Sequence, residues 1–155
     1  MSRLIAYLGR FAVILLGFAC AALAASAFLH LLLIGGLDWR GDEVGPVVAG
    51  ALLLSIPLVS LFVAYISFLP AAVVVLAAEL LGRRDWLFFT LSGGGVGLVV
   101  ARFAPGREAG WTDSGLLWAL VACGIAGGLA YWLVAGRGSG RWLHPDPSAP
   151  RRPAS

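Results

Sequence analysis

Three ionisable side chains lie within or beside apolar stretches of this 155-residue chain and are the first candidates for chemistry: Glu79, His30 and Arg102. A charged group in an apolar run is a candidate functional residue, because burying a charge is costly. Glu79 could serve as a proton or cation site. It also precedes Arg83 by four residues, the spacing at which Glu and Arg meet on one helix face, and Arg10 belongs to the same predicted boundary. We therefore expect an interfacial salt bridge at Glu79.

His30 lies six residues before the end of the first apolar run, at Gly36. We expect a neutral imidazole that hydrogen-bonds a neighbouring helix; the alternative is a proton-coupled or pH-responsive group. The one other histidine, His144, is in the polar C-terminal segment, which leaves no adequate ligand set for zinc. Neither a serine with a partner base nor a glycine-rich phosphate loop is found. The sequence predicts no catalytic, cofactor or metal site, and hence no enzyme.

Composition points to lipid as the solvent for most of the chain. Hydrophobic residues make up 60% and charged residues 12% of the sequence, whereas soluble domains have about 45–50% apolar and about 25% charged residues. The net charge is +3, and the arginines stand at the ends of apolar runs. Membrane topology accounts for these arginines, so we expect no nucleic-acid partner.

Four apolar segments follow one another, separated by turns rich in glycine, proline and charge. The predicted spans are about 11–36, 47–81, 86–103 and 115–135. The first is too long for the apolar part of a signal peptide and suits an uncleaved span. After the fourth, residues 137–155 are rich in Pro, Gly, Ser and Arg and predict a disordered cytoplasmic tail.

The second segment is the ambiguous one, because 35 residues are too many for one span and few for two. A single span places eight arginines on one side of the membrane against three on the other, whereas a hairpin gives four against seven. The positive-inside rule favours the single span, with both termini in the cytoplasm. Pro57 and Pro70 each free a carbonyl, of Leu53 and Ile66, that nearby serines could satisfy. The predicted fold is an all-α membrane protein, a four-transmembrane-helix bundle whose overlong second helix is kinked near Pro70.

Small residues at four-residue spacing carry the packing signal, because they let helix backbones approach closely in lipid. They are Gly17 and Ala21 in the first span, Gly93 and Gly97 in the third, and Gly124 and Gly128 in the fourth. We expect them to pack the helices of one chain together. A homodimer built on the face of Gly124 and Gly128 is the alternative.

In size, helix pattern and composition the chain is similar to small uncharacterised four-helix inner-membrane proteins of α-proteobacteria, a resemblance that implies no activity. The leading hypothesis is a non-enzymatic structural or accessory subunit of the bacterial inner membrane. Its expected partners are the lipid bilayer and either a second copy or an unidentified membrane protein. The alternative is a small proton- or ion-linked transporter or channel, with Glu79, His30 and the kinked second helix as its working parts.

Overall fold

The computed structural model describes residues 2–36, 46–103 and 114–139. Within these ranges the chain is helical apart from the turn that joins the second and third helices and the turn residues Ala135 and Ser139. The elements are α1 (Ser2–Gly36), α2 (Pro46–Leu81), α3 (Trp86–Phe103), α4 (Ser114–Val134) and a short 3-10 helix, η2 (Gly136–Gly138). The predicted loops at 37–45 and 104–113 and most of the predicted tail lie outside the described residues.

Two helix ends show how local sequence defines these elements. α2 ends at Leu81 because Gly82 takes a positive φ of 61°, and the Arg83 amide then donates to the Ala78 carbonyl at 3.0 Å. This 6→1 bond is the glycine-terminated Schellman ending. α1 begins at Ser2, nine residues before the predicted span. Hydropathy marks only the apolar stretch, whereas the helix extends beyond it through the polar residues that precede it.

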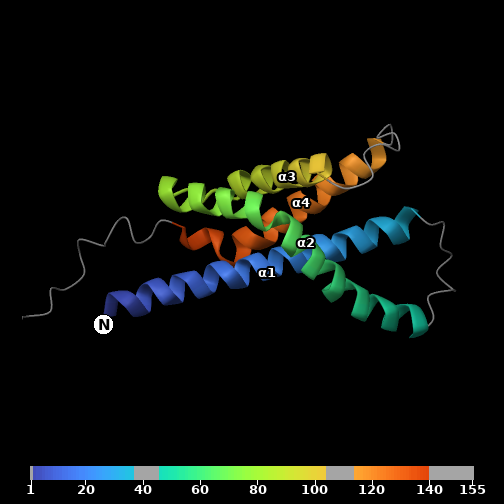
Figure 1. The fold of residues 1–155 in the computed structure, drawn as a ribbon, viewed down its shortest axis with the longest axis horizontal. Coiled ribbons are helices and arrows are strands. Elements are labelled where there is room, and N and C mark those ends of the chain that lie inside the picture. Colours follow the sequence, from blue (N-terminus) through green and yellow to red (C-terminus); the bar gives the residue numbers. More distant parts are fainter. Residues whose placement is uncertain (1, 37–45, 104–113, 140–155) are drawn as a thin grey trace, which may run out of the picture.

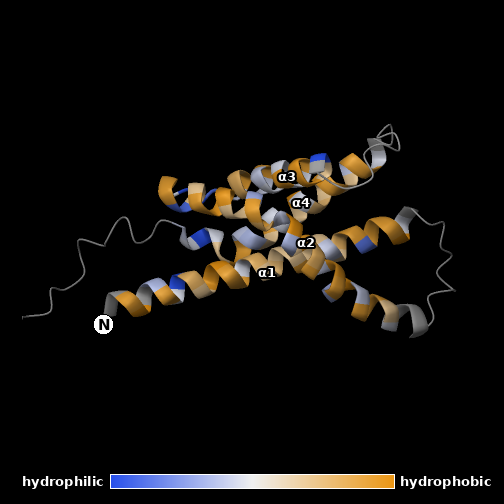
Figure 2. Cartoon of the chain, in the orientation of Figure 1, coloured by the Kyte–Doolittle hydropathy of each residue, from blue (hydrophilic) through white to orange (hydrophobic). Residues whose placement is uncertain are grey.

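Three helices are long and apolar enough to cross a membrane: the segments Tyr7–Gly35, Gly50–Leu81 and Gly115–Val134. α3 is also apolar but shorter; its 18 residues correspond to about 27 Å of helix. Figure 2 shows hydrophobic residues along most of the helices, with hydrophilic ones at the α2–α3 turn, at η2 and at single positions within α1 and near the end of α3. Many of the large hydrophobic side chains are exposed. An apolar exterior of this kind suits lipid rather than water.

The four helices alternate in direction, and α4 lies between α3 and α1, against which it packs most extensively. α2 crosses this three-helix layer, contacting α1 and, less extensively, α3 (Figure 1). α2 is one continuous helix with two internal prolines, as the charge asymmetry predicted, rather than a hairpin. It changes direction along its length (Figure 1), as expected of a helix in which prolines remove backbone hydrogen bonds.

Serine hydroxyls along α2 bind the backbone, but at other carbonyls than those the sequence suggested. Ser55, Ser60 and Ser67 donate to the carbonyls of Leu52, Pro57 and Val63, at 3.3, 2.7 and 2.7 Å. The expected acceptors were the carbonyls of Leu53 and Ile66, which the prolines free. A serine on a helix reaches the carbonyl three or four residues before it, and that register sets the observed partners.

Glycines bring the backbones of α3 and α4 into direct contact. A Cβ atom added at Gly93 would collide with the carbonyl oxygen of Gly124 and lie 3.0 Å from Cα of Gly128; one added at Gly97 would collide with the carbonyl oxygen of Leu120. No larger residue fits there without moving a helix. The face of Gly124 and Gly128, considered for a homodimer, thus packs against α3 of the same chain.

The small residues of α1 pack on the adjacent face of α4. A Cβ atom at Gly17 would lie 2.7 Å from Cβ of Ala135 and 3.2 Å from the ring of Tyr131, and one at Gly127 would lie 3.1 Å from the carbonyl oxygen of Ala21. Each of the three predicted small-residue pairs therefore lies at a helix–helix contact within the chain. The close approach lets α4 hold both neighbours at once.

Candidate functional site

An ion pair between α1 and α2 is the centre of the polar network in the described structure. Arg10 of α1 donates through Nη2 to Oε1 of Glu79, near the end of α2, and through Nε to the same oxygen at 3.1 Å. The side chains are 21% and 11% exposed. We call this end of the molecule, where α1 begins and α2 and α4 end, the basic end. Partial burial removes water that would otherwise screen the pair, so its attraction is stronger than at a protein surface.

The same guanidinium also holds the end of α4. Its Nη1 donates to the carbonyl of Ala135 and its Nη2 to the hydroxyl of Ser139, both at 3.2 Å. The last carbonyls of a helix lack intrahelical donors and form the negative end of its dipole, so a cation placed there is stabilising. Arg10 therefore joins α1, α2 and the α4–η2 segment through one planar group.

A second arginine connects the α2–α3 turn to the same place. Arg84 donates through Nε to the carbonyl of Ser139 at 2.9 Å, and its own carbonyl accepts a bond from the indole of Trp132 at 2.8 Å. The guanidinium of Arg137 lies 4.6 Å from the centre of the Trp132 ring, within cation–π range. Ser139 is 1% exposed and meets both Arg10 and Arg84, so it links three segments of the chain.

Beneath this network lies an apolar cluster of Ala78, Phe89, Tyr131 and Ala135. The rings of Phe89 and Tyr131 pack at 5.4 Å between centroids. The Tyr131 hydroxyl is buried and has no hydrogen-bond partner among the described residues. The cluster keeps water from the inner side of the ion pair. The arrangement can hold helices together, and its carboxylate is neutralised by a guanidinium rather than exposed to a substrate.

The expectation of a salt bridge at Glu79 named Arg83 and Arg10 as neighbours, and the ion pair described above is with Arg10. Arg83 follows Gly82, whose positive φ turns the chain away from the helix axis, so the four-residue rule for a continuous helix no longer applies. Arg83 instead lies 3.6 Å from Asp85, and both side chains are more than half exposed.

His30 hydrogen-bonds its own helix rather than a neighbouring one. Its Nδ1 lies 2.8 Å from the carbonyl of Ser26, four residues earlier on α1. The bond between helices is made by Ser26, a fully buried residue whose hydroxyl donates to the Ile56 carbonyl of α2 at 2.8 Å. The expectation for His30 was therefore wrong in its partner, because a carbonyl one turn back is already within reach of the ring.

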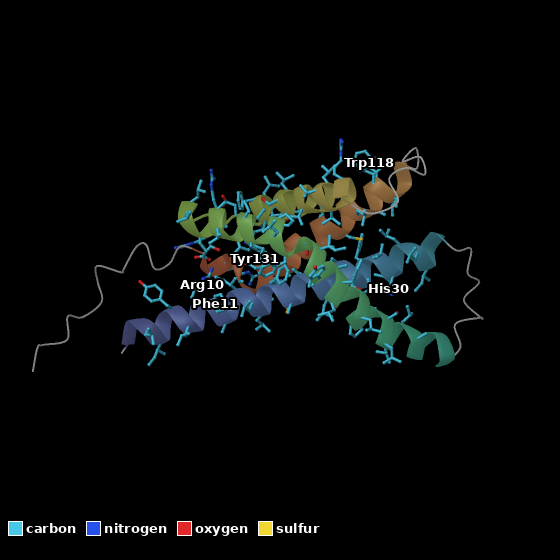
Figure 3. The ribbon with its side chains drawn as sticks, in the orientation of Figure 1. Arg10, Phe11, His30, Trp118 and Tyr131 are labelled. Carbon is cyan, nitrogen blue, oxygen red and sulfur yellow. The ribbon has the colours of Figure 1, made fainter. Side chains whose placement is uncertain are left out.

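The sequence candidates do not form one site. His30 follows Arg10 by 20 residues on α1, which is about 30 Å of helix, and Figure 3 shows the two far apart, with Tyr131 on the side of Arg10. Arg102 is exposed in the last turn of α3, at the end of that helix away from the α2–α3 turn. Within the described ranges no group of three or more His, Cys, Asp or Glu side chains could hold a metal ion.

Sequence reasoning missed the roles of Ser26, Ser139 and Tyr131. Ser139 fell within the range predicted as a tail, 137–155, yet residues Gly136–Gly138 form η2 and Ser139 is buried against two arginines. Ser26 carries a recognisable signal, because a serine in an apolar helix must find an acceptor.

No family model, curated protein or solved structure matches this chain.

Proposed function

We propose that this chain is an integral protein of a bacterial inner membrane, that it crosses the bilayer four times with both termini in the cytoplasm, and that it acts as a non-enzymatic structural or accessory subunit. Three helices of sufficient length and hydropathy support the membrane location. α3 completes the count in this proposal, since about 27 Å of helix approaches the roughly 30 Å hydrocarbon core.

The distribution of arginine supports the orientation. Arg10, Arg83, Arg84 and Arg137 lie at the basic end, and Arg102 is at the opposite end of α3. Arginine is retained on the cytoplasmic side during insertion, so the basic end faces the cytoplasm. Trp86 and Trp132 lie at this same end, at the level where amphipathic rings prefer the headgroup region.

The engagement of Glu79 and His30 inside the bundle is the observation that favours a structural role over transport. Glu79 is bound by Arg10, and His30 by the backbone of its own helix. A proton-coupled carrier needs such groups free to exchange protons with water, whereas here their bonds hold helices and helical turns in place. We therefore place function in the assembly of this bundle with a membrane partner rather than in transport.

Cysteine accessibility tests this role against the transporter alternative. Ala78→Cys and Ala27→Cys, placed in separate cysteine-free variants, report on water near Glu79 and His30. We expect both to resist a charged, water-soluble thiol reagent in membranes, while Asp85→Cys on the exposed turn reacts readily. Reaction at both interior positions at a rate close to that of Asp85→Cys would establish a hydrated path and reject the packed bundle.

Co-purification tests the accessory role itself. Tagged protein solubilised from its own membrane in a mild detergent should retain a membrane-protein partner in a fixed ratio, and a variant with the ion pair replaced should retain less. A variant of the exposed pair of Arg83 and Asp85, Asp85→Asn, serves as the matched control. Recovery of the chain alone from native membrane, under conditions that preserve other complexes, would contradict the accessory role.

A further inference from the structure

A cavity of about 330 Å³ lies beneath α2, and all four helices contribute to its walls. Its lining is aliphatic, aromatic or glycine except for Ser67, Cys123 and the phenol of Tyr131. The Ser67 hydroxyl is already bound to the carbonyl of Val63. No charged side chain is among the residues that line it. The glycines of the α3–α4 contact form part of its wall. Because glycine has no side chain, these positions leave the space beside the two helices unfilled.

The chemistry of this cavity favours a hydrocarbon occupant. A buried water needs two to four polar partners, and these walls do not offer such a set. Protein interiors are close-packed, so a void of this size forfeits dispersion contacts along its whole lining. In a bilayer the surrounding medium is itself hydrocarbon, and a chain that enters the cavity restores those contacts. The volume lies at the lower end of the range of ligand pockets, about 300–1,000 Å³.

The basic end supplies a complementary charge at a suitable distance. Val75 lines the cavity, and α2 ends six residues later at Leu81, about 9 Å along the helix. Arg83 and Arg84 follow directly and are exposed. A phosphate bound at this turn would leave its acyl chains at the depth of the cavity, and arginines near a membrane surface attract anionic lipids.

Two further observations agree with a lipid ligand, one on its route of entry and one on its polar contacts. α2 packs less extensively against α3 than α1 and α4 pack against each other, so the α2–α3 side is the less tightly closed one. Tyr131 also lines the cavity, toward the basic end, and its buried hydroxyl has no partner among the residues described. An ester carbonyl of a lipid would give that hydroxyl an acceptor, which buried hydroxyls normally have.

We infer that the cavity binds one acyl chain of an anionic phospholipid, whose phosphate lies at the turn of Arg83 and Arg84. This inference rests on the membrane placement proposed above. It makes the lipid a specific ligand of the bundle rather than only its solvent. A seated chain would support α2, which packs less extensively against the other helices than they pack against one another.

Photo-crosslinking in vesicles tests the inference. The protein is reconstituted into phosphatidylethanolamine vesicles that contain phosphatidylglycerol with a diazirine in its acyl chain, and adducts are mapped by mass spectrometry. We expect adducts at buried Cys123, which lines the cavity, as well as at exposed Leu69. Val96→Phe, which fills the cavity from α3, should lower labelling at Cys123 about tenfold and leave Leu69 unchanged.

Val99→Phe is the matched control, because Val99 lies on the same helix but is 41% exposed; it should leave labelling at Cys123 unchanged. Ala71→Leu fills the cavity from α2 and should repeat the loss if Val96→Phe fails to fold. Labelling of Leu69 without Cys123, or equal labelling in the Val96→Phe and Val99→Phe variants, would overturn the inference. If the proposed membrane placement itself were wrong, the outcome would be different: Leu69 would also remain unlabelled, and alkaline carbonate would extract the protein from the vesicles.

The headgroup has its own comparison. A phosphatidylcholine probe with the same diazirine chain lacks net negative charge and should label Cys123 less than the phosphatidylglycerol probe. The double variant Arg83→Gln and Arg84→Gln should remove that preference. Equal labelling by the two probes in the native protein would refute the part of the inference that places an anionic phosphate at this turn.

Discussion

Replacing the Arg10–Glu79 pair in a double-mutant cycle tests whether the basic end works as one unit. Removing one partner of a buried ion pair commonly costs about 3–5 kcal/mol, because the other charge stays buried and unpaired. Glu79→Leu should cost less, about 2 kcal/mol, because Arg10 is 21% exposed and keeps the carbonyl of Ala135 and the hydroxyl of Ser139 as acceptors. Arg10→Met should cost about 4 kcal/mol, since it removes those two bonds as well as the ion pair.

The double variant separates the pair from its surroundings. Two apolar side chains of similar volume leave no unpaired charge, so the cost should fall to about 2 kcal/mol, about 1 kcal/mol for each of the bonds lost at Ala135 and Ser139. The two single costs add to about 6 kcal/mol, which gives a coupling of about 4 kcal/mol. Asp85→Asn is the control, because the exposed pair of Arg83 and Asp85 should contribute less than about 1 kcal/mol.

The assay is reversible unfolding in mixed micelles, with a denaturing detergent as the titrant and helical circular dichroism as the readout. Each variant is compared with the native protein by its unfolding midpoint and slope. Additive single costs, with a coupling near zero, would refute the idea that Arg10 and Glu79 stabilise the fold through each other. Equal costs for Arg10→Met and Glu79→Leu would instead refute the role given to Arg10 at the end of α4.

Three further predictions concern other contacts of the bundle. Gly93→Ala places a Cβ against a carbonyl of α4 and should lower the free energy of unfolding by about 2 kcal/mol. Gly95→Ala has open space around it and should raise the free energy of unfolding by up to about 1 kcal/mol; equal unfolding midpoints for the two variants would refute the close contact. A chain truncated after Gly136 should be less stable than one truncated after Ser139, because only the longer one keeps the bonds to Arg10 and Arg84, and indistinguishable midpoints would remove η2 from the network. Ser26→Ala should cost about 1 kcal/mol through the lost bond to α2, and no change in unfolding would show that the bond contributes nothing.

The helices could be predicted from the sequence because apolar runs and their breakers are local signals. Pro46 begins α2, and Gly82 ends it, and both residues are recognisable without a structure. The small-residue faces were also predictable, since residues four apart share one side of a helix. Which faces would meet was not given by any single helix, because the partner of Gly93 lies about 30 residues away on α4.

The network at the basic end was harder to predict, because it depends on the ends of three helices, α1, α2 and α4, coming together. Ser139 looked like part of a polar tail, and nothing local distinguishes it from the serines that follow. Ser139 is buried against two arginines, Arg10 on α1 and Arg84 on the α2–α3 turn. Arg10 itself was recognisable as a topological signal, but its bond to Ala135 required the end of α4 to be placed. Long-range polar contacts of this kind depend on tertiary packing rather than on composition.

The contacts that hold α2 differ in kind from those that hold the other helices. α1, α3 and α4 meet through glycine and alanine along their middles. α2 is instead joined to α1 by hydrogen bonds at two levels, from Ser26 to Ile56 and from Arg10 to Glu79, with the edge-to-face rings of Phe18 and Phe68 between them. The cavity lies between these two attachments. A polar bond in lipid is directional and can be lost at one point, while a glycine contact is spread over several turns. Loss of the ion pair should therefore loosen α2 over the cavity and leave the α3–α4 contact intact.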